Sequence, residues 1–187
     1  MTEFIFHDQE SAPKNSKPLL AGALQSYGFL PNLYAGQAEA PALLEGYLSL
    51  AGIFNKTDLS ETERQIIMMT NNRLNGCEYC MAAHTTIALG AKIADDVIEA
   101  LRTNTAIADP KLEALRQFSE RINKTRGWID QNDLDALFSA GYSRKTALEV
   151  IVGTALKVMS TYTNHIINTP LDDAFTSNAW SAPTGTT

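Results

Sequence analysis

The chain has 187 residues, of which 44% are hydrophobic and 19% charged, a balance typical of a globular domain with a substantial core. Its formal net charge is −6 and no long basic run occurs, which argues against nucleic-acid binding. No segment resembles a signal peptide or a membrane span, so we expect a cytoplasmic protein without a membrane partner. Two cysteines do not make a disulfide framework, and a close pair in a reducing compartment is typical of catalysis, redox sensing or metal binding.

Helix start and stop signals recur along the chain, whereas strand-like alternation is absent. The sequence therefore predicts an all-α fold of about seven to nine helices, after an extended or mobile lead-in over residues 1–17. The expected helices run from Pro18 to about Gly28, from Pro31, from Pro41 to about Asn55, from Ser60 to about Asn75, from Cys77 to Gly90, from Ala94 to Arg102, from Pro110 to Gly127, from Asp130 to Ala140 and from Ser143 to about Ile167.

These signals predict one helical domain over residues 18–173, because the connections are short and no linker interrupts them. Residues 174–187 form a polar tail that carries two isolated aromatic residues, Phe175 and Trp180. Such a tail is expected either to be mobile or to dock on a neighbouring subunit.

Residues 77–84, Cys-Glu-Tyr-Cys-Met-Ala-Ala-His, contain both cysteines of the chain. On a helix, a rotation of about 100° per residue places Cys77, Cys80 and His84 within roughly 60° of one another. A thiol pair with a base one turn away can carry out two-electron redox chemistry, because the thiolate is the reactive form and a nearby base favours it.

The turn expected at Asn75-Gly76 puts Cys77 in the first turn of the new helix, where unpaired N–H groups and the helix dipole favour a thiolate. Cys80 is expected within reach of the His84 imidazole. One cysteine would attack a peroxide oxygen, and the other would resolve the sulfenic acid to a disulfide that an external dithiol reduces.

Two other interpretations remain open for this segment. The cysteines could be small buried hydrophobic residues, with His84 bonded to a backbone carbonyl. Alternatively, both cysteines and His84 could bind a metal with His165 as the fourth ligand, although the spacing does not match the second half of a zinc site.

Tyr79 is expected to shape a pocket or donate a hydrogen bond. Tyr162 and His165 could line the same cavity, although core packing is the stronger expectation for both.

The combination of motifs resembles the alkylhydroperoxidase AhpD-like, carboxymuconolactone decarboxylase superfamily over roughly residues 18–173. The resemblance rests on Leu59 to Gln65, Arg73 to Cys80 and His84, and also on Pro31-Asn32-Leu33, Pro41 to Gly46, Ala140 to Ser143, Thr163-Asn164-His165 and Pro170-Leu171-Asp172. It implies a helical fold whose subunits assemble as trimers or as hexamers built from dimers. It also implies thiol peroxidase activity on hydroperoxides, an external dithiol or protein reductant, and no metal or other cofactor.

The resemblance assigns the peroxide-reactive thiol to Cys80, the resolving thiol to Cys77 and a proton relay to His84. The simple helix-dipole argument would favour Cys77 instead. Family members with decarboxylase activity lack the paired cysteines, so their presence here argues against lactone decarboxylation.

One position departs from the family pattern, because Gln65 stands where the relay normally has a glutamate. Glutamine can orient an imidazole or a water but cannot accept a proton as a carboxylate does. Glu61 and Glu45 are candidate substitutes, although Glu61 is expected to be a solvated surface group. The departure favours a second hypothesis, a redox-responsive regulatory or thiol–disulfide exchange protein with little peroxidase turnover.

Overall fold

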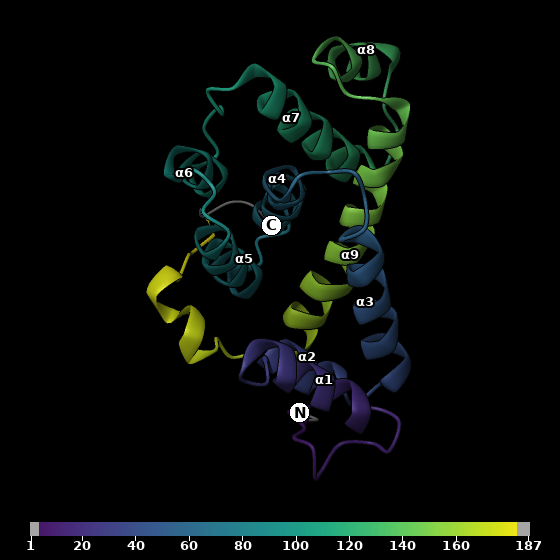
Figure 1. The fold of residues 1–187 in the computed structure, drawn as a ribbon, viewed down its shortest axis with the longest axis vertical. Helices are drawn as coiled ribbons and strands as arrows, with labels where there is room; N and C mark the ends of the chain where they lie inside the picture. The colour runs from purple at the N-terminus through teal and green to yellow at the C-terminus, as the bar shows by residue number, and fades with distance from the viewer. Residues whose placement is uncertain (1–3, 183–187) are drawn as a thin grey trace.

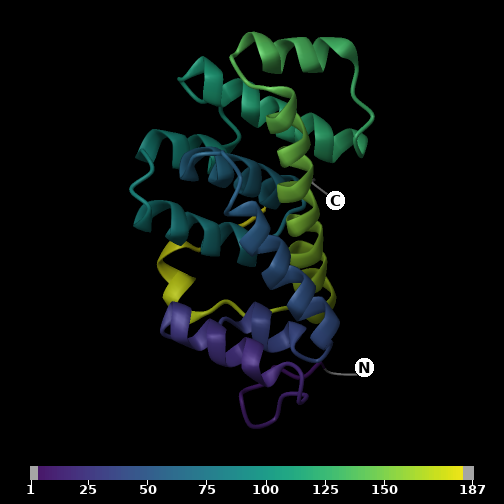
Figure 2. The ribbon, with the colours of Figure 1, turned by 45° about the vertical axis from the view of Figure 1, so that its right-hand side comes forward.

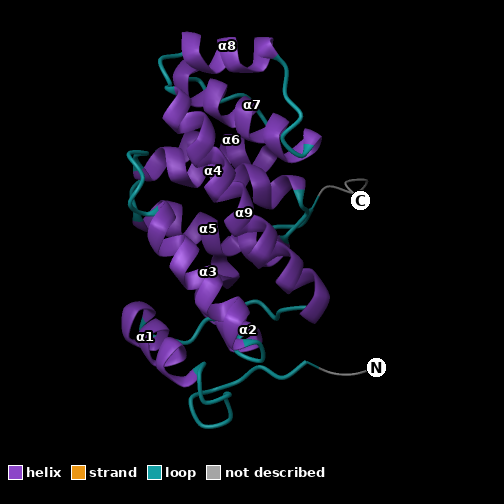
Figure 3. Ribbon diagram, turned by 90° about the vertical axis from the view of Figure 1, so that its right-hand side faces the viewer, coloured by secondary structure: helices purple, strands orange, loops and turns teal. Residues whose placement is uncertain are grey.

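The computed structural model describes residues 4–182, and this part of the chain is all-helical without strands (Figures 1 and 3). The first three residues of the expected lead-in and the last five of the expected tail lie outside the described residues. The helices are α1 (Lys17–Tyr27), α2 (Asn32–Gln37), α3 (Pro41–Phe54), α4 (Glu61–Leu74), α5 (Glu78–Gly90), α6 (Asp95–Thr103), α7 (Pro110–Thr125), α8 (Gln131–Ser139), α9 (Arg144–Ile167) and the short 3₁₀-helix η1 (Asp173–Asn178).

Helix α4 lies at the centre of the domain and packs against α5, α7 and α9 (Figure 1). Its start is the expected capping box, in which Ser60 and Glu63 bond reciprocally to each other's backbone N–H. All residues from Gln65 to Arg73 are buried, so this helix is enclosed on every side rather than amphipathic. Polar groups of α4 are therefore held inside the protein, where they can serve a site.

Helix α9 is the longest element and runs beside both α3 and α4, which lets one helix contribute residues to several layers (Figure 2). The close approach depends on Gly153. A Cβ atom at this position would lie 2.7 Å from Ile67 Cγ2 and 2.9 Å from Phe54 Cζ. Glycine is thus required on the inner face of α9 for steric reasons.

The turn between α4 and α5 sets the position of the cysteines. Gly76 has a φ of 63°, a left-handed conformation that glycine adopts without steric cost, and this reverses the chain after Asn75. The buried Asn72 holds both sides of the turn, because its carbonyl accepts the Cys77 N–H and its side-chain amide donates to the Cys80 carbonyl. The turn is therefore fixed by buried hydrogen bonds.

The described part of the tail packs on its own chain, which matches neither of the two expectations for it. Phe175 is buried, and η1 lies against α5 (Figure 1). At the end of η1, Arg102 donates to the carbonyls of Asn178 and Ala179, and the indole of Trp180 donates to the Arg102 carbonyl. Through residue 182 the tail is thus a strap that covers one side of α5.

The lead-in is also tied to the domain in its described part. His7 is buried, its backbone N–H donates to the Ala35 carbonyl, and its Nε2 lies 2.6 Å from Glu39 Oε2. Among residues 4–182 no helix combines the length and apolar character that a membrane span requires.

Candidate active site

Cys77 and Cys80 lie at the beginning of α5, one turn apart. Cys77 is the N-cap residue, and its sulfur accepts the backbone N–H of Cys80 over 3.4 Å. Both thiols are free, and both are buried, with exposures of 1% and 2%. The expected helix start is confirmed to within one residue, although Cys77 caps the first turn instead of lying inside it.

Helix α9 supplies the groups around the Cys80 sulfur. The side-chain amide of Asn164 donates to Cys80 Sγ at 3.1 Å and also lies 3.6 Å from Cys77 Sγ. The Ser160 hydroxyl oxygen lies 3.9 Å from Cys80 Sγ. These are polar contacts to sulfur in an otherwise apolar interior, and they stabilise a thiolate more than a thiol.

The environment separates the two thiols electrostatically. Burial alone would raise the pKa of Cys80, but the Cys77 thiol, the charge of Lys157 and the donors Ser160 and Asn164 together bring that pKa below its usual range. The pKa of Cys77 is raised, because Cys77 donates to the Cys80 thiolate and is itself buried beside it. These environments favour a thiolate at Cys80 and a protonated thiol at Cys77. This agrees with the assignment that the resemblance implied and disagrees with the simple helix-dipole argument.

His84 belongs to a hydrogen-bonded line that crosses three helices. Its Nε2 lies 3.2 Å from the ammonium nitrogen of Lys157, and its Nδ1 lies 2.8 Å from Gln65 Oε1. The Gln65 amide in turn donates to Glu61 Oε1 at 2.8 Å. An ammonium group can only donate, so Nε2 is the acceptor and Nδ1 carries the hydrogen that Gln65 accepts. Each group in this line therefore donates a hydrogen bond to the next one, from Lys157 through His84 and Gln65 to Glu61.

The expectation that Cys80 lies within reach of the His84 imidazole stays a prediction, and both residues line one cavity. The two nitrogens of the imidazole ring are already bonded to Lys157 and Gln65. Burial and the charge of Lys157 hold the pKa of His84 well below its usual range, so the imidazole is neutral at pH 7. Glu61, expected at the solvated surface, is half-buried and bonded to Gln65, whereas Glu45 is exposed.

Cys80 lines a small aromatic cavity of about 60 Å³, which we call the thiol cavity. Lys157 and His84 line it with Cys80, whereas Cys77 does not. A wider outer cavity of about 460 Å³ shares the His84 wall and extends to Glu61 and Arg64. The apolar side of the thiol cavity is formed by Tyr27, Pro31, Leu33, Tyr34, Tyr47, Tyr79, Ala83, Ile87 and Phe175.

Tyr79 both shapes the thiol cavity and donates a hydrogen bond, as expected of it. Its hydroxyl donates to Asp172 Oδ2 at 2.5 Å and accepts the Leu33 N–H at 3.3 Å. Asp172 also accepts the Asn32 N–H, so one buried carboxylate ties the strap to α2 and α5. Tyr79 therefore holds the wall of the cavity rather than the reacting sulfur.

The metal interpretation has no support among residues 4–182, because no group of His, Cys, Asp or Glu side chains there is arranged to hold a metal ion. His165, its proposed fourth ligand, is exposed on α9. Tyr162 is 55% exposed, so neither the cavity nor the core-packing expectation holds for these two residues.

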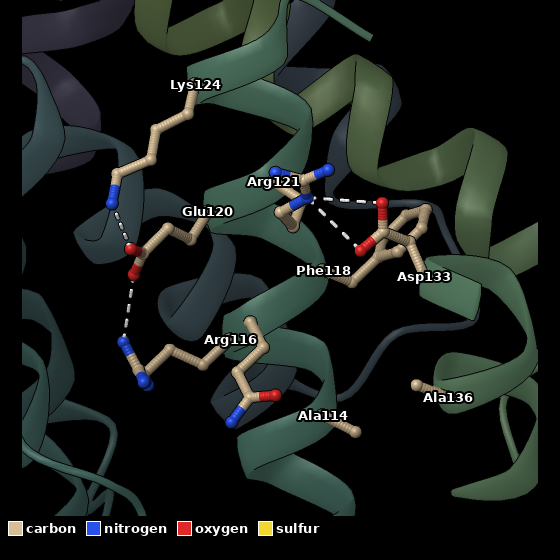
Figure 4. A pocket seen from close by; sticks show the side chains of 9 residues that line it. Ala114, Arg116, Phe118, Glu120, Arg121, Lys124, Asp133 and Ala136 are labelled. Carbon is tan, nitrogen blue, oxygen red and sulfur yellow. Dashed lines mark hydrogen bonds and ion pairs between the residues drawn. The ribbon is translucent and has the colours of Figure 1, made fainter. Parts of the chain in front are cut away.

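A separate hollow between α7 and α8 carries charged side chains (Figure 4). Its charges are already paired, because Glu120 bridges Arg116 and Lys124 while Arg121 contacts Asp133. Without a nucleophile or an unpaired charge, this hollow is a weaker candidate than the thiol cavity.

The sequence analysis assigned no role to three residues around Cys80, namely Lys157, Ser160 and Asn164, although Asn164 lies in one of the segments that carry the resemblance. Their spacing of three and four residues places them on one face of a helix. That face is buried, because it also carries Val150 and Gly153. A lysine in register with core residues was the signal that could have identified the group.

Sequence comparison matches residues 39–120 to the model of the carboxymuconolactone decarboxylase family, a segment that runs from before α3 into α7 and includes both cysteines and His84. No curated protein matches the chain.

Solved structures with the same fold cover nearly the whole chain. One is the alkylhydroperoxidase AhpD core of a peroxidase-related protein from Ralstonia eutropha JMP134, with a TM-score of 0.82, 20% identity, and 94% of this chain and 96% of that chain covered. A peroxidase-related protein from Silicibacter sp. TM1040 has a TM-score of 0.78 and 17% identity, over 93% and 95% of the two chains. The debrominase Bmp8, as its C82A variant in complex with 2,3,4-tribromopyrrole, has a TM-score of 0.79 and 19% identity, over 95% and 96%.

Proposed function

Because the chain belongs to the AhpD-like, carboxymuconolactone decarboxylase superfamily, we propose that it is a thiol-dependent peroxidase that reduces hydroperoxides through a Cys77/Cys80 dithiol–disulfide cycle. The observation that carries the proposal is the position of the Cys80 sulfur. It lines a cavity, it has thiolate-stabilising groups on α9, and it lies beside a second thiol.

In the proposed cycle the Cys80 thiolate attacks the terminal oxygen of a hydroperoxide, which forms an S–O bond and breaks the O–O bond. The alcohol leaves and Cys80 becomes a sulfenic acid. The Cys77 thiol then attacks the Cys80 sulfur, water leaves, and a disulfide forms. An external dithiol reduces that disulfide and restores both thiols.

The cavities support an organic substrate as well as hydrogen peroxide. The thiol cavity holds roughly the volume of two waters, which suits an –O–OH group. The outer cavity shares Tyr27, Tyr34 and Tyr47 with it and could receive an alkyl or aryl tail.

The test is the consumption of cumene hydroperoxide and hydrogen peroxide under excess dithiol. We expect turnover in the wild type and none in Cys80→Ser. Cys77→Ser is the matched control and is assayed without dithiol, where it should consume one equivalent rapidly and then stop as a trapped sulfenic acid. Retained turnover in Cys80→Ser would contradict the proposal. Absence of wild-type turnover, together with a redox-dependent change in assembly, would instead support the regulatory hypothesis.

A second candidate function is reductive dehalogenation of an aromatic halide, and the aromatic cavity beside Cys80 favours it together with the fold shared with the debrominase Bmp8. The Cys80 thiolate would attack the halogen and take it from carbon, and the carbanion would be protonated. Cys77 would then displace halide from Cys80 and form the same disulfide. Halide release from a brominated pyrrole, with none from Cys80→Ser, would distinguish this activity from peroxide reduction.

We also propose that the chain is a homo-oligomer, as the resemblance implies. Support comes from large apolar side chains on the outer face of α9, where Leu148, Ile151 and Ile166 are at least half exposed. Light scattering after size-exclusion chromatography tests this proposal. Ile151→Lys should shift the wild-type mass toward the monomer, and a monomeric wild type would contradict it.

A further inference from the structure

Lys157 is only 1% exposed, yet among residues 4–182 no ion pair joins it to a carboxylate. An isolated buried charge is costly unless it is compensated, and the charge of Lys157 in turn favours the thiolate form of Cys80. The same lysine lines the thiol cavity together with Cys80, and this cavity is the space that a substrate of Cys80 would occupy.

The hydrogen-bond pattern leaves Lys157 with protons to give. One of its three hydrogens goes to His84 Nε2, and the other two remain for the cavity. His84 cannot serve as the donor in the same way, because its hydrogen is on Nδ1 and points to Gln65. Two tyrosine hydroxyls of the cavity are committed as well, since Tyr79 bonds to Asp172, and Tyr34 bonds to Tyr27.

We propose that Lys157 is the acid catalyst of this site, which protonates the atom that leaves when the Cys80 thiolate attacks its substrate. This inference rests on the proposed function and deepens it. Lys157 then donates the proton directly, in place of a relay through His84. His84 accepts a hydrogen bond from the ammonium group of Lys157 and so orients it.

The step balances as follows. The Cys80 thiolate, a hydroperoxide and the Lys157 ammonium give a Cys80 sulfenic acid, an alcohol and a neutral amine. Cys77 then forms the disulfide and releases water, whose second hydrogen comes from the Cys77 thiol. When an external dithiol reduces the disulfide, one of its protons returns to Cys77 and the other to Lys157, and Cys80 is again a thiolate.

The proposal predicts a dependence on the leaving group. An alkoxide is a poor leaving group without a proton, whereas the carboxylate that leaves from peroxyacetic acid needs none. General acid catalysis contributes roughly 10²–10⁴-fold, so Lys157→Met should slow thiolate oxidation by cumene hydroperoxide by about 100-fold or more. Oxidation by peroxyacetic acid should slow by less than about 10-fold, after both rates are corrected for the thiolate fraction.

Two variants separate proton donation from charge and from folding. Lys157→Arg keeps the cation but is not deprotonated in proteins, so it should preserve the thiolate without restoring the rate on cumene hydroperoxide. Lys145→Met removes an exposed lysine in the first turn of the same helix and should change neither rate. Circular dichroism melts establish that each variant is folded.

Other titratable groups around Lys157 also affect the pH profile of the rates. They are Cys77 at the N-cap of α5, Cys80, His84 and Tyr79 on α5, Tyr47 on α3, Tyr34 on α2 and Tyr27 on α1. Equal slowing of both oxidants in Lys157→Met would overturn the proposal, as would full recovery in Lys157→Arg.

A second probe pair makes the inference independent of peroxidase activity. Cys80 of the Cys77→Ser protein is reacted with 4,4′-dithiodipyridine, whose thiolate leaves readily, and with hydroxyethyl disulfide, whose thiolate is basic. Lys157→Met should slow the second reaction far more than the first, and equal slowing would refute the acid role. A wild type that reduces no hydroperoxide would overturn the peroxidase proposal, while this pair still decides the role of Lys157.

Discussion

Asn164 donates its side-chain amide to the sulfur of Cys80 at 3.1 Å, from a helix that is remote from the cysteines in sequence. The same nitrogen lies 3.6 Å from Cys77, so one amide contacts both sulfurs. This contact joins the resolving and attacking thiols to α9, and it makes the electrostatics of the pair depend on a residue outside the cysteine motif.

Replacing Asn164 with alanine should raise the pKa of Cys80, because the thiolate loses a donor in a buried site. A hydrogen bond to a charged group is worth about 1.5–3 kcal/mol, so the shift should be about one to two pH units. The measurement is the rate of iodoacetamide alkylation against pH in Cys77→Ser protein. Asn164→Asp should shift the pKa further, because a carboxylate would face the thiolate, and an unchanged profile in both variants would refute the role.

Replacing Gln65 with glutamate restores the carboxylate of the family pattern, but it does so beside Glu61, whose Oε1 accepts the Gln65 amide at 2.8 Å. Two adjacent carboxylates repel, so one must be protonated or move away. We therefore expect Gln65→Glu alone to lower the free energy of unfolding by about 1–3 kcal/mol, since an interior donor is lost.

The double variant Gln65→Glu/Glu61→Gln should recover most of this loss, because the amide and carboxylate exchange places. Urea unfolding at pH 7 measures both effects. A single variant as stable as the wild type would show that Glu61 does not constrain position 65.

The stability of the reduced protein should fall as the pH is lowered from about 8.5 to 5.5, where 8.5 is the ordinary thiol pKa. The folded state depresses the pKa of Cys80, so this group stabilises the fold above the unfolded thiol pKa and loses its contribution as the pH falls. His84 changes the stability in the same direction, because folding also depresses its pKa. Below about pH 6.5 the imidazole takes up a proton in the unfolded chain but not in the folded one, so stability falls there as well.

Thermal melts over this range test the prediction, with a slope of up to about 1.4 kcal/mol per pH unit for each group. The pKa of Cys80 is about 6 in the folded state, so Cys80→Ser should show a shallower slope between about pH 6 and 8.5 and a slope close to that of the wild type below this window. Above about pH 8.5 the raised pKa of Cys77 has the opposite sign, so stability should decline there. Identical slopes in both proteins would contradict the assignment of Cys80.

The helices were predictable because local signals mark their ends, as at the Ser60–Glu63 capping box and at Asp109, whose carboxylate caps α7. The interior of the site was not, because Lys157 and Asn164 reach the cysteines only through the packing of α9 on the other helices. A cysteine motif indicates which residues react, but it does not predict which side chains of distant helices contact them.

The close packing of α9 at Gly153 predicts that a larger residue there destabilises the fold. Alanine there would place its Cβ against Ile67 and Phe54, so Gly153→Ala should destabilise the fold by about 1–3 kcal/mol despite the better helix propensity of alanine. Gly22→Ala is the matched control, because nothing lies within 4 Å of its added Cβ, and it should stabilise by about 0.5–1 kcal/mol. Chemical denaturation measures both, and an equal sign for the two would refute the close approach of α9.

Cys80 lines the thiol cavity and Cys77 does not, which has a consequence for the choice of electron donor. An incoming thiol should meet the disulfide at Cys80 and release Cys77 as a free thiol beside the new mixed disulfide. That neighbour would expel a monothiol and close the ring again, so glutathione would be a futile donor. A dithiol carries its own second sulfur and completes the exchange, so turnover should be much faster with dihydrolipoate than with glutathione at equal thiol concentration.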